Sequence, residues 1–452
     1  MTRSTLFFLH ALGSSGAQWQ EVIAHLDQRY DCQALDLPGF GDTPVQGHTD
    51  VASLVKWFCQ VVIDSGASSW LVVGHSMGAK IATLAAARAA AGEAGLAGLW
   101  GVVLLAGSPP AREPMDASRR KDMLGWVEHG PISRRDADTF VSANTAGPLP
   151  ERLRERAIQD VMRADPLAWR AWLEHGSRED WREEAGRLAF PACIIAGAED
   201  GDLGAQAQRD LNLPHYAEVE DVRVLDHAAH FLPYEKPLEV ADAIDALATT
   251  ALGRALPDDF LSLLNSSRVD PRMRARLIAR NLPPDPQAAG VFNQAQRQVL
   301  AAIVAQVVAS SEGADELARR IDIALAAGEG DGWRFAELLP DKDAWIAGLA
   351  SVDALAGGFC HRTAAEQASL LHQIQRGELA VGAASPLDPD QLALWFEDAC
   401  AQIARVWTSL PRTMAKMGYD GFAVARDGEL ALGYALTGAN EVEAWQLGAR
   451  RA

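Results

Sequence analysis

The chain has 452 residues, of which 48% are hydrophobic and 22% charged, and its formal net charge is −19. The length predicts two or three domains, and the composition is that of a soluble globular protein without an apolar run long enough for a membrane insertion. The negative charge argues against nucleic acid or an anionic membrane surface as a partner.

The five cysteines are scattered along the chain and form no C-x-x-C pair. This pattern is typical of a reducing compartment and argues against a disulfide framework or a zinc site. Because residues 5–9 already read as a first core strand, we expect no cleavable secretory segment, and a cytoplasmic location follows as the default.

Short apolar segments alternate with helical stretches up to about residue 250. This alternation predicts an α/β fold, with a mostly parallel sheet covered by helices on both faces and ligands at the carboxyl ends of the strands. The expected strands are residues 6–9, 32–35, 71–73, 102–106, 192–196 and 222–225.

The sequence G-H-S-M-G at residues 74–78 follows the apolar run 70–73 and precedes a stretch of strong helix formers at 79–87. A serine with a glycine two positions to either side, between a strand and a helix, is the nucleophile-elbow pattern. The sharp turn strains the serine backbone and requires neighbours without side chains. We therefore expect Ser76 to be a nucleophile at a helix N-terminus, where the helix dipole stabilises negative charge; the alternative is a chance serine in a tight turn.

Between residues 108 and 187 the alternation stops, and the chain becomes helical, charged and rich in tryptophan. We expect this segment to form a helical cap over the sheet edge. We expect the tryptophans of this segment to pack inside the cap rather than to contact a substrate. They are Trp126, Trp169, Trp172 and Trp181.

A nucleophilic serine needs a base and an orienting acid, and in this type of fold the acid precedes the histidine along the chain. Asp200 follows the expected strand 192–196, and His230 follows the expected strand 222–225. Both positions are at carboxyl ends of strands, so we expect them at the same sheet edge as Ser76.

Residues 1 to about 250 resemble the α/β-hydrolase superfamily. A typical ending in that family is His-Phe-hydrophobic-Pro-x-Glu-x-Pro, and residues 230–237 match it. The resemblance therefore places His230 at the catalytic position, in preference to His227.

The same resemblance favours Asp200 as the acid over its loop neighbours Glu199 and Asp202, because Asp200 matches the family's position after the seventh strand. It implies acyl transfer to water, in which His230 takes the Ser76 proton and Asp200 stabilises the imidazolium. No metal or organic cofactor is implied. The substrate stays open, because the superfamily includes esterases, lactonases, thioesterases, carbon–carbon hydrolases and perhydrolases.

The oxyanion hole is expected to use the amide of Met77, the residue after the nucleophile, and a second amide from the loop at residues 10–16. That loop resembles the family's His-Gly loop, which maps the second amide to Leu12. Ala11 stands where glycine is usual, so the loop departs from the family's pattern one residue before Leu12. We expect His10 to support the loop rather than to act in catalysis.

After about residue 252 helical patterns dominate. Residues 295–308 carry apolar side chains at helical spacing, and Thr363 with Glu366 forms a capping-box pattern. Asp388 and Pro389 predict the start of another helix. Residues 281–286 look like a connecting loop.

Residues 290 to about 447 resemble the small helical subunit of gluconate 2-dehydrogenase complexes, the subunit 3 family. In that family the helical chain binds a large flavoprotein of the glucose-methanol-choline class and carries no redox centre, so the resemblance implies a flavoprotein dehydrogenase as a partner. Members usually carry a twin-arginine export signal, and its absence here argues against periplasmic export. The resemblance rests on segments 355–367, 395–398, 414–422 and 438–445.

The expected organisation is a hydrolase domain at 1–252, a helical connection at 253–290 and an all-α domain at 291–452. One hypothesis is a serine hydrolase acting on an ester, lactone or related carbonyl substrate, fused to a docking module. The alternative is a non-catalytic accessory subunit of an oxidoreductase complex. We expect Met414 and Met417 to pack in a helix core rather than against a partner.

Overall fold

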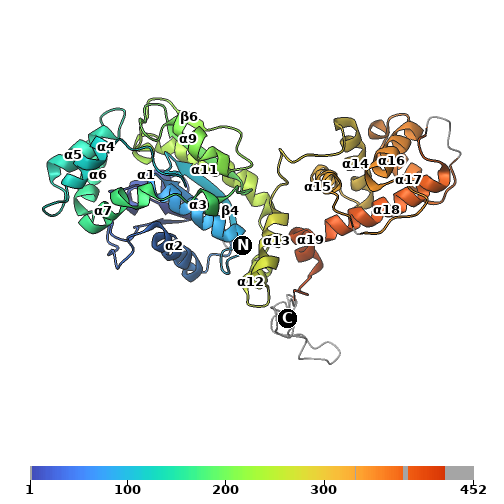
Figure 1. Cartoon of the computed structure of the whole chain (residues 1–452), viewed down its shortest axis with the longest axis horizontal. Helices are drawn as coiled ribbons and strands as arrows, with labels where there is room; N and C mark the ends of the chain where they lie inside the picture. Colours follow the sequence, from blue (N-terminus) through green and yellow to red (C-terminus); the bar gives the residue numbers. More distant parts are fainter. Residues whose placement is uncertain (1–2, 331, 380–384, 423–452) are drawn as a thin grey trace, which may run out of the picture. The chain divides into compact units, whose positions relative to one another are not determined.

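The computed structural model describes residues 3–330, 332–379 and 385–422. The chain divides into two compact units (Figure 1). Among the described residues, the first unit holds the chain up to Leu282 together with residues 418–422, and the second unit lies within Pro283–Met417.

A six-stranded parallel sheet forms the middle of the first unit, in the order β2-β1-β3-β4-β5-β6. Each strand overlaps one of the six apolar segments of the sequence, so the predicted α/β fold is confirmed. The strands are β1 (Thr5–Leu9), β2 (Asp31–Leu35), β3 (Trp70–His75), β4 (Leu99–Leu105), β5 (Ala192–Gly197) and β6 (Arg223–Leu225).

Helices cover both faces of the sheet, which explains why β1, β3 and β4 are buried at every position rather than at alternate ones. Successive residues of β1 show this directly. Phe8 packs against Trp19 on the face that also carries α1 (Gln20–Ile23) and α11 (Pro237–Ala251). Phe7 points to the opposite face, where it packs edge-on against Phe58 of α2 (Val51–Ser65).

The expected cap is present as a run of helices between β4 and β5, drawn in teal and green in Figure 1. Its tryptophans divide between two roles. Trp169 is fully buried and donates its indole N–H to Met123 O at 2.9 Å, as expected for cap packing, whereas Trp172 lines the pocket described below. The helices are α4 (Ala117–Gly125), α5 (Arg134–Ala143), α6 (Glu151–Arg163), α7 (Pro166–Glu174) and α8 (Arg182–Ala185).

Residues 253–282, expected to be a connection, fold as part of the first unit. They form α12 (Asp258–Asn265) and α13 (Pro271–Asn281), which are fixed by the buried guanidinium of Arg274. Arg274 donates to Gly92 O at 2.7 Å, just after the helix at residues 77–90, and to three carbonyls around the α12–α13 turn. The boundary between the units therefore lies at Leu282, inside the Pro-rich stretch that the sequence marks as a loop.

The second unit is all helical in its described part, as the sequence predicts. The capping boxes at Thr363 and Asp388 are both formed, and the apolar face of the helix at 294–307 is buried. Its core centres on Trp345 and Trp395, whose rings meet edge to face at 5.8 Å. The helices are α14 (Gln294–Val307), α15 (Ala314–Ala327), α16 (Asp341–Ala356), α17 (Ala364–Gln375), α18 (Pro389–Thr408) and α19 (Pro411–Met417).

A fully buried carboxylate, Asp322, holds the start of the second unit in place. It accepts the N–H groups of Val291 at 2.6 Å and Phe292 at 2.9 Å, just before α14 begins, and pairs with Arg319 at 3.1 Å. Buried charges are tolerated when they are hydrogen-bonded and paired in this way.

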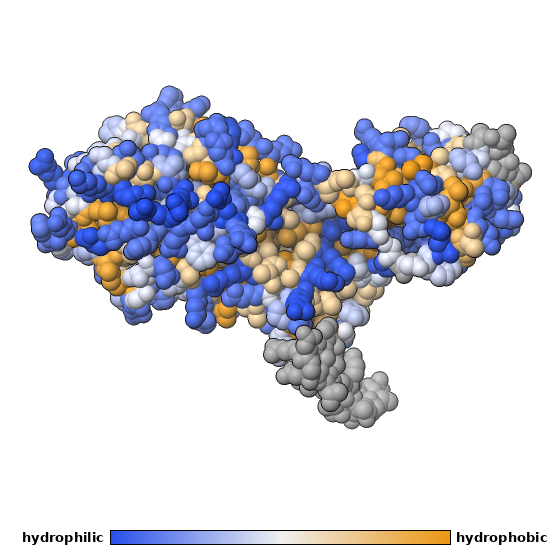
Figure 2. Space-filling view, viewed as in Figure 1, coloured by the Kyte–Doolittle hydropathy of each residue, from blue (hydrophilic) through white to orange (hydrophobic). Residues whose placement is uncertain are grey.

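The surface of the first unit seen in Figure 2 is mostly hydrophilic, whereas the second unit shows several apolar side chains on the same view. Met417 is 52% exposed, so the expected helix-core role is wrong for that residue. Among the described helices, none is both long and apolar enough to cross a membrane. The segment 438–445, used in the resemblance to subunit 3, lies outside the described residues.

Candidate active site

Ser76 occupies a strained turn between β3 and α3 (Met77–Ala90), with φ 50° and ψ −117°. The two glycines of the motif are required by close backbone approaches. A Cβ at Gly74 would come within 2.6 Å of the Ala79 Cα, and one at Gly78 within 2.5 Å of the Leu9 carbonyl oxygen. The strain persists because the surrounding backbone fixes it, and such outliers cluster at functional sites.

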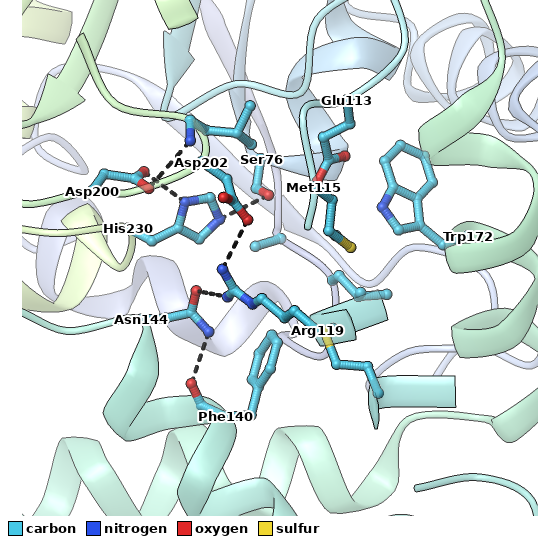
Figure 3. Close-up of a pocket in the computed structure, with 14 residues that line it drawn as sticks. Ser76, Glu113, Met115, Arg119, Phe140, Asn144, Trp172, Asp200, Asp202 and His230 are labelled. Atoms are coloured by element: carbon cyan, nitrogen blue, oxygen red, sulfur yellow. Dashed lines mark hydrogen bonds and ion pairs between the residues drawn. The ribbon is translucent and has the colours of Figure 1, made fainter. Parts of the chain in front are cut away.

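The structure brings Ser76, Asp200 and His230 together at the carboxyl ends of the strands (Figure 3). The His230 Nδ1–H donates to Asp200 Oδ2 at 2.8 Å, and the Ser76 hydroxyl donates to His230 Nε2 at 2.9 Å. All three side chains are largely buried, at 13% exposure or less for the His230 and Asp200 side chains. This arrangement can move a proton from the serine to the imidazole while the carboxylate holds the ring.

Electrostatics favour an ionised acid and a basic imidazole in this pair. Burial alone raises the pKa of Asp200, but the charge and hydrogen bond of His230 outweigh it and hold that pKa below its usual range. Burial likewise opposes the charge on His230, but the Asp200 carboxylate outweighs it and raises the pKa of the histidine above 6.5.

The backbone around His230 is fixed from two sides. The N–H groups of His230 and Phe231 donate to the Asn144 carbonyl in the cap, at 3.1 and 3.0 Å. On the other side, His75 Nε2–H donates to the His230 carbonyl at 2.8 Å. Burial lowers the pKa of His75 to about 3, so this histidine stays neutral, with the proton of its ring on Nε2.

The competing residues of the sequence lie outside this arrangement. The His227 side chain is 90% exposed and lies 3.8 Å from the exposed carboxylate of Glu199. Asp202 forms an ion pair with Arg119 at 3.0 Å. The geometry therefore supports the preference for His230 and Asp200.

His10 fixes the loop that follows β1. Its Nε2 accepts the N–H of Leu37 at 2.9 Å, so its Nδ1 carries the proton and donates to the Ala11 carbonyl at 2.8 Å. Burial lowers the pKa of His10 to about 4, which keeps the ring neutral. Ala11 and Leu12 line the pocket beside Ser76, and Met77 is the first residue of α3.

Lys80, one turn after the nucleophile, joins α3 to the base of the cap. Its side chain is fully buried, and its ammonium donates to the carbonyls of Ala111, Gly176 and Glu179 at 3.0 to 3.1 Å. The ammonium also lies 5.8 Å from the centroid of the Trp172 ring. Burial lowers the pKa of Lys80 to about 8.

The pocket around Ser76 contains polar residues that the sequence did not single out. Arg119 donates to Asp202 and, at 3.0 Å, to Asn144, and Glu113 approaches from the loop before the cap. They come from cap segments without a motif, so only the folded chain reveals them. Within the described ranges, no group of three or more His, Cys, Asp or Glu side chains is arranged to hold a metal ion. Apolar walls come from Leu12, Met115, Met123, Phe140, Trp172 and Leu203.

Residues 6–243 match the model of the alpha/beta hydrolase family. The chain belongs to this family. A relative in Salmonella typhimurium, 2-succinyl-6-hydroxy-2,4-cyclohexadiene-1-carboxylate synthase, is 29% identical over 253 residues, covering 53% of this chain and 92% of the relative.

Two solved structures are also similar to this α/β-hydrolase chain. An esterase from Exiguobacterium antarcticum covers 55% of this chain and 92% of its own at 13% identity, with a TM-score of 0.48. A mutant of the N-acyl homoserine lactonase AidH covers 55% of this chain and 91% of its own at 19% identity, with a TM-score of 0.44.

The burial of Lys80 predicts a pH dependence of stability. Its folded pKa of about 8 lies below its ordinary 10.5, so between these values the unfolded chain binds more protons and stability rises with pH. The wild type should therefore gain about 1–2 kcal/mol relative to Lys80→Met between pH 8 and 9.5. Urea unfolding at both pH values measures this, with the exposed Lys56→Met as a control, which should show no such gain. Equal pH slopes for the wild type and Lys80→Met would contradict the assignment.

Proposed function

We propose that the chain is a serine hydrolase that acts on an ester, lactone or related carbonyl substrate, with Ser76, Asp200 and His230 as its catalytic triad. The observation that carries this proposal is the unbroken chain of hydrogen bonds from the Ser76 hydroxyl through His230 to Asp200. Membership of the α/β-hydrolase family supports it.

In the proposed reaction, the Ser76 oxygen attacks the substrate carbonyl while His230 Nε2 takes the serine proton. Asp200 stabilises the resulting imidazolium. His230 then gives the proton to the leaving group, and a water molecule repeats the sequence on the acyl-enzyme, which releases the acid and restores the serine. The first of these proton transfers joins two atoms that already lie within hydrogen-bond distance, Ser76 Oγ and His230 Nε2 at 2.9 Å.

The developing oxyanion is proposed to bind the backbone amides of Met77 and Leu12. Met77 begins α3, where the helix dipole favours negative charge, and Leu12 lies in the loop that His10 holds beside Ser76. Ala11 stands in this loop where the family usually has glycine. Its side chain is buried, and its backbone φ is not positive, so its conformation is one that alanine adopts readily.

Substitutions of the triad test this proposal. A fluorophosphonate probe should label the wild type at Ser76, and Ser76→Ala should abolish the labelling. His230→Ala should lower kcat/KM for an aryl ester by about three orders of magnitude or more. His227→Ala is the matched control for His230→Ala and should retain activity on the aryl ester. A wild type that the probe does not label at neutral pH would contradict the triad.

The triad also predicts a pH dependence. In the wild type kcat/KM should rise with pH through a pKa above 6.5, because only the neutral imidazole of His230 accepts the proton.

A second candidate is a reaction on a carboxylate-bearing cyclohexadiene of the kind that the Salmonella relative's name describes. The specific observation that favours it is Arg119, whose guanidinium lines the pocket near His230. Its bonds to Asp202 and Asn144 use one N–H on each terminal nitrogen, so further N–H groups can bind a substrate carboxylate.

Calorimetry with 2-succinyl-6-hydroxy-2,4-cyclohexadiene-1-carboxylate tests the second candidate. The Ser76→Ala variant should bind this compound, and adding Arg119→Met should weaken binding about tenfold or more, because one charge-assisted contact is lost. Fluorophosphonate labelling of the single Arg119→Met variant controls for an intact Ser76. Equal affinity with and without Arg119, or no binding at all, would count against this candidate.

For the second unit we propose a docking role, on the basis of its resemblance to subunit 3 of gluconate 2-dehydrogenase complexes. The proposed partner is a flavoprotein dehydrogenase of the glucose-methanol-choline class. Large apolar side chains on the surface of this unit fit such a role; they include Trp333, Leu339, Trp407 and Met417, which are 37–58% exposed. If the triad were inactive, the chain would instead be a non-catalytic accessory subunit.

Co-purification from the native host tests the docking role. Tagged full-length chain should recover a protein that carries a flavin absorbance spectrum, and Trp407→Glu should reduce the recovery without affecting fluorophosphonate labelling of Ser76. Repeated purification without any flavoprotein would contradict the docking role and leave the hydrolase proposal unaffected.

A further inference from the structure

Glu113 is a carboxyl group in the pocket that the proposed triad does not use. It lies on the loop between β4 and α4, and its side chain lines the same pocket as Ser76 and Trp172. In the view of Figure 3 its carboxyl group lies between these two residues. Its backbone N–H donates to the Ser177 carbonyl at 2.8 Å, which fixes the loop against the cap.

The carboxyl group is held at a fixed position relative to the nucleophile. The buried Ser108 hydroxyl donates to Glu113 Oε2 at 2.8 Å, and the Ser108 N–H donates to the Ser76 carbonyl at 3.0 Å. A single residue, Ser108, therefore links the backbone of the serine to the carboxylate of Glu113. A substrate whose carbonyl carbon lies at Ser76 would share the pocket with this carboxyl group.

The cations near Glu113 are committed to other partners. The Lys80 ammonium donates to three backbone carbonyls, and the Arg120 guanidinium donates to Leu173 O and Ser177 Oγ. The charges of Lys80 and Arg120 act on Glu113 only through space and lower the pKa of its carboxyl group. Burial raises this pKa by more, so the pKa lies above its usual value. A carboxyl group that faces a ligand pocket with one oxygen bound by Ser108 has its second oxygen available for a ligand.

We propose that Glu113 is a specificity-determining residue that selects substrates carrying a hydroxyl group close to the reacting carbonyl. A hydroxyl group fits better than the other polar groups. It donates to a carboxylate and accepts from a carboxylic acid, so it binds Glu113 in either protonation state. A substrate ammonium would meet Lys80, Arg120 and the imidazolium that forms at His230, and a substrate carboxylate would meet a like group. An apolar substituent would leave a desolvated carboxyl group without a partner.

This inference rests on the proposed hydrolase function, and two pairs of esters test it. On the acyl side, 4-nitrophenyl butyrate is compared with 4-nitrophenyl 3-hydroxybutyrate. On the alcohol side, propyl butyrate is compared with 3-hydroxypropyl butyrate in a pH-stat. In at least one pair the wild type should prefer the hydroxylated ester by about tenfold or more in kcat/KM.

Two variants separate specificity from structural support. Glu113→Leu should abolish the preference, lowering kcat/KM for the hydroxylated ester relative to the plain ester by about tenfold or more. Glu113→Gln keeps an acceptor for Ser108 and a polar group for the substrate, so it should keep most of the preference. Fluorophosphonate labelling of each variant reports that Ser76 and His230 are intact.

The outcomes are distinguishable. Equal losses on both esters of a pair would assign Glu113 a structural role and overturn the inference. A labelled wild type without a hydroxyl preference in either pair would also overturn it, without affecting the triad. An unlabelled wild type would contradict the proposed function itself, and the inference with it.

Discussion

The site depends on one close contact, between the first turn of α3 and the carboxyl end of β1. Gly78 lets the helix backbone lie against the Leu9 carbonyl, and Gly74 lets β3 lie against the helix at Ala79. A side chain at either position would push the helix away from the sheet. The contact holds Ser76 at φ 50°, where its hydroxyl projects toward His230 instead of packing into the helix.

Further contacts extend from this helix to the rest of the pocket. Lys80, on the next turn, supports the base of the cap through three carbonyls, and Ser108 binds the Ser76 carbonyl from the end of β4. The cap in turn fixes His230 through the Asn144 carbonyl. Ser76, His230 and the cap are therefore positioned relative to one another by contacts to backbone groups, which is the kind of support a preorganised site requires.

Local patterns predicted most of the fold, because they record local physics. Six apolar segments became six strands, and the capping boxes at Thr363 and Asp388 mark helix starts, since those side chains bind amides only three residues away. The positions of Glu113 and Arg119 could not be predicted in this way. They reach the pocket only after the cap folds onto the sheet, through contacts between residues far apart in sequence, such as Glu113 N–H to Ser177 O. The docking of α12 and α13 by Arg274 is non-local for the same reason.

Two partly buried carboxyl groups that line one pocket show how environment assigns different chemistry to the same functional group. Asp200 faces a histidine that can carry a positive charge, and this partner holds its pKa below the usual range despite burial. Glu113 faces cations that are already bound elsewhere, so burial dominates and its pKa rises. The first environment suits a permanent negative charge that stabilises an imidazolium. The second suits a group whose hydrogen-bond requirement is best met by a ligand. These environments agree with the roles proposed for Asp200 in proton transfer and for Glu113, which Ser108 holds in the pocket, in the choice of substrate.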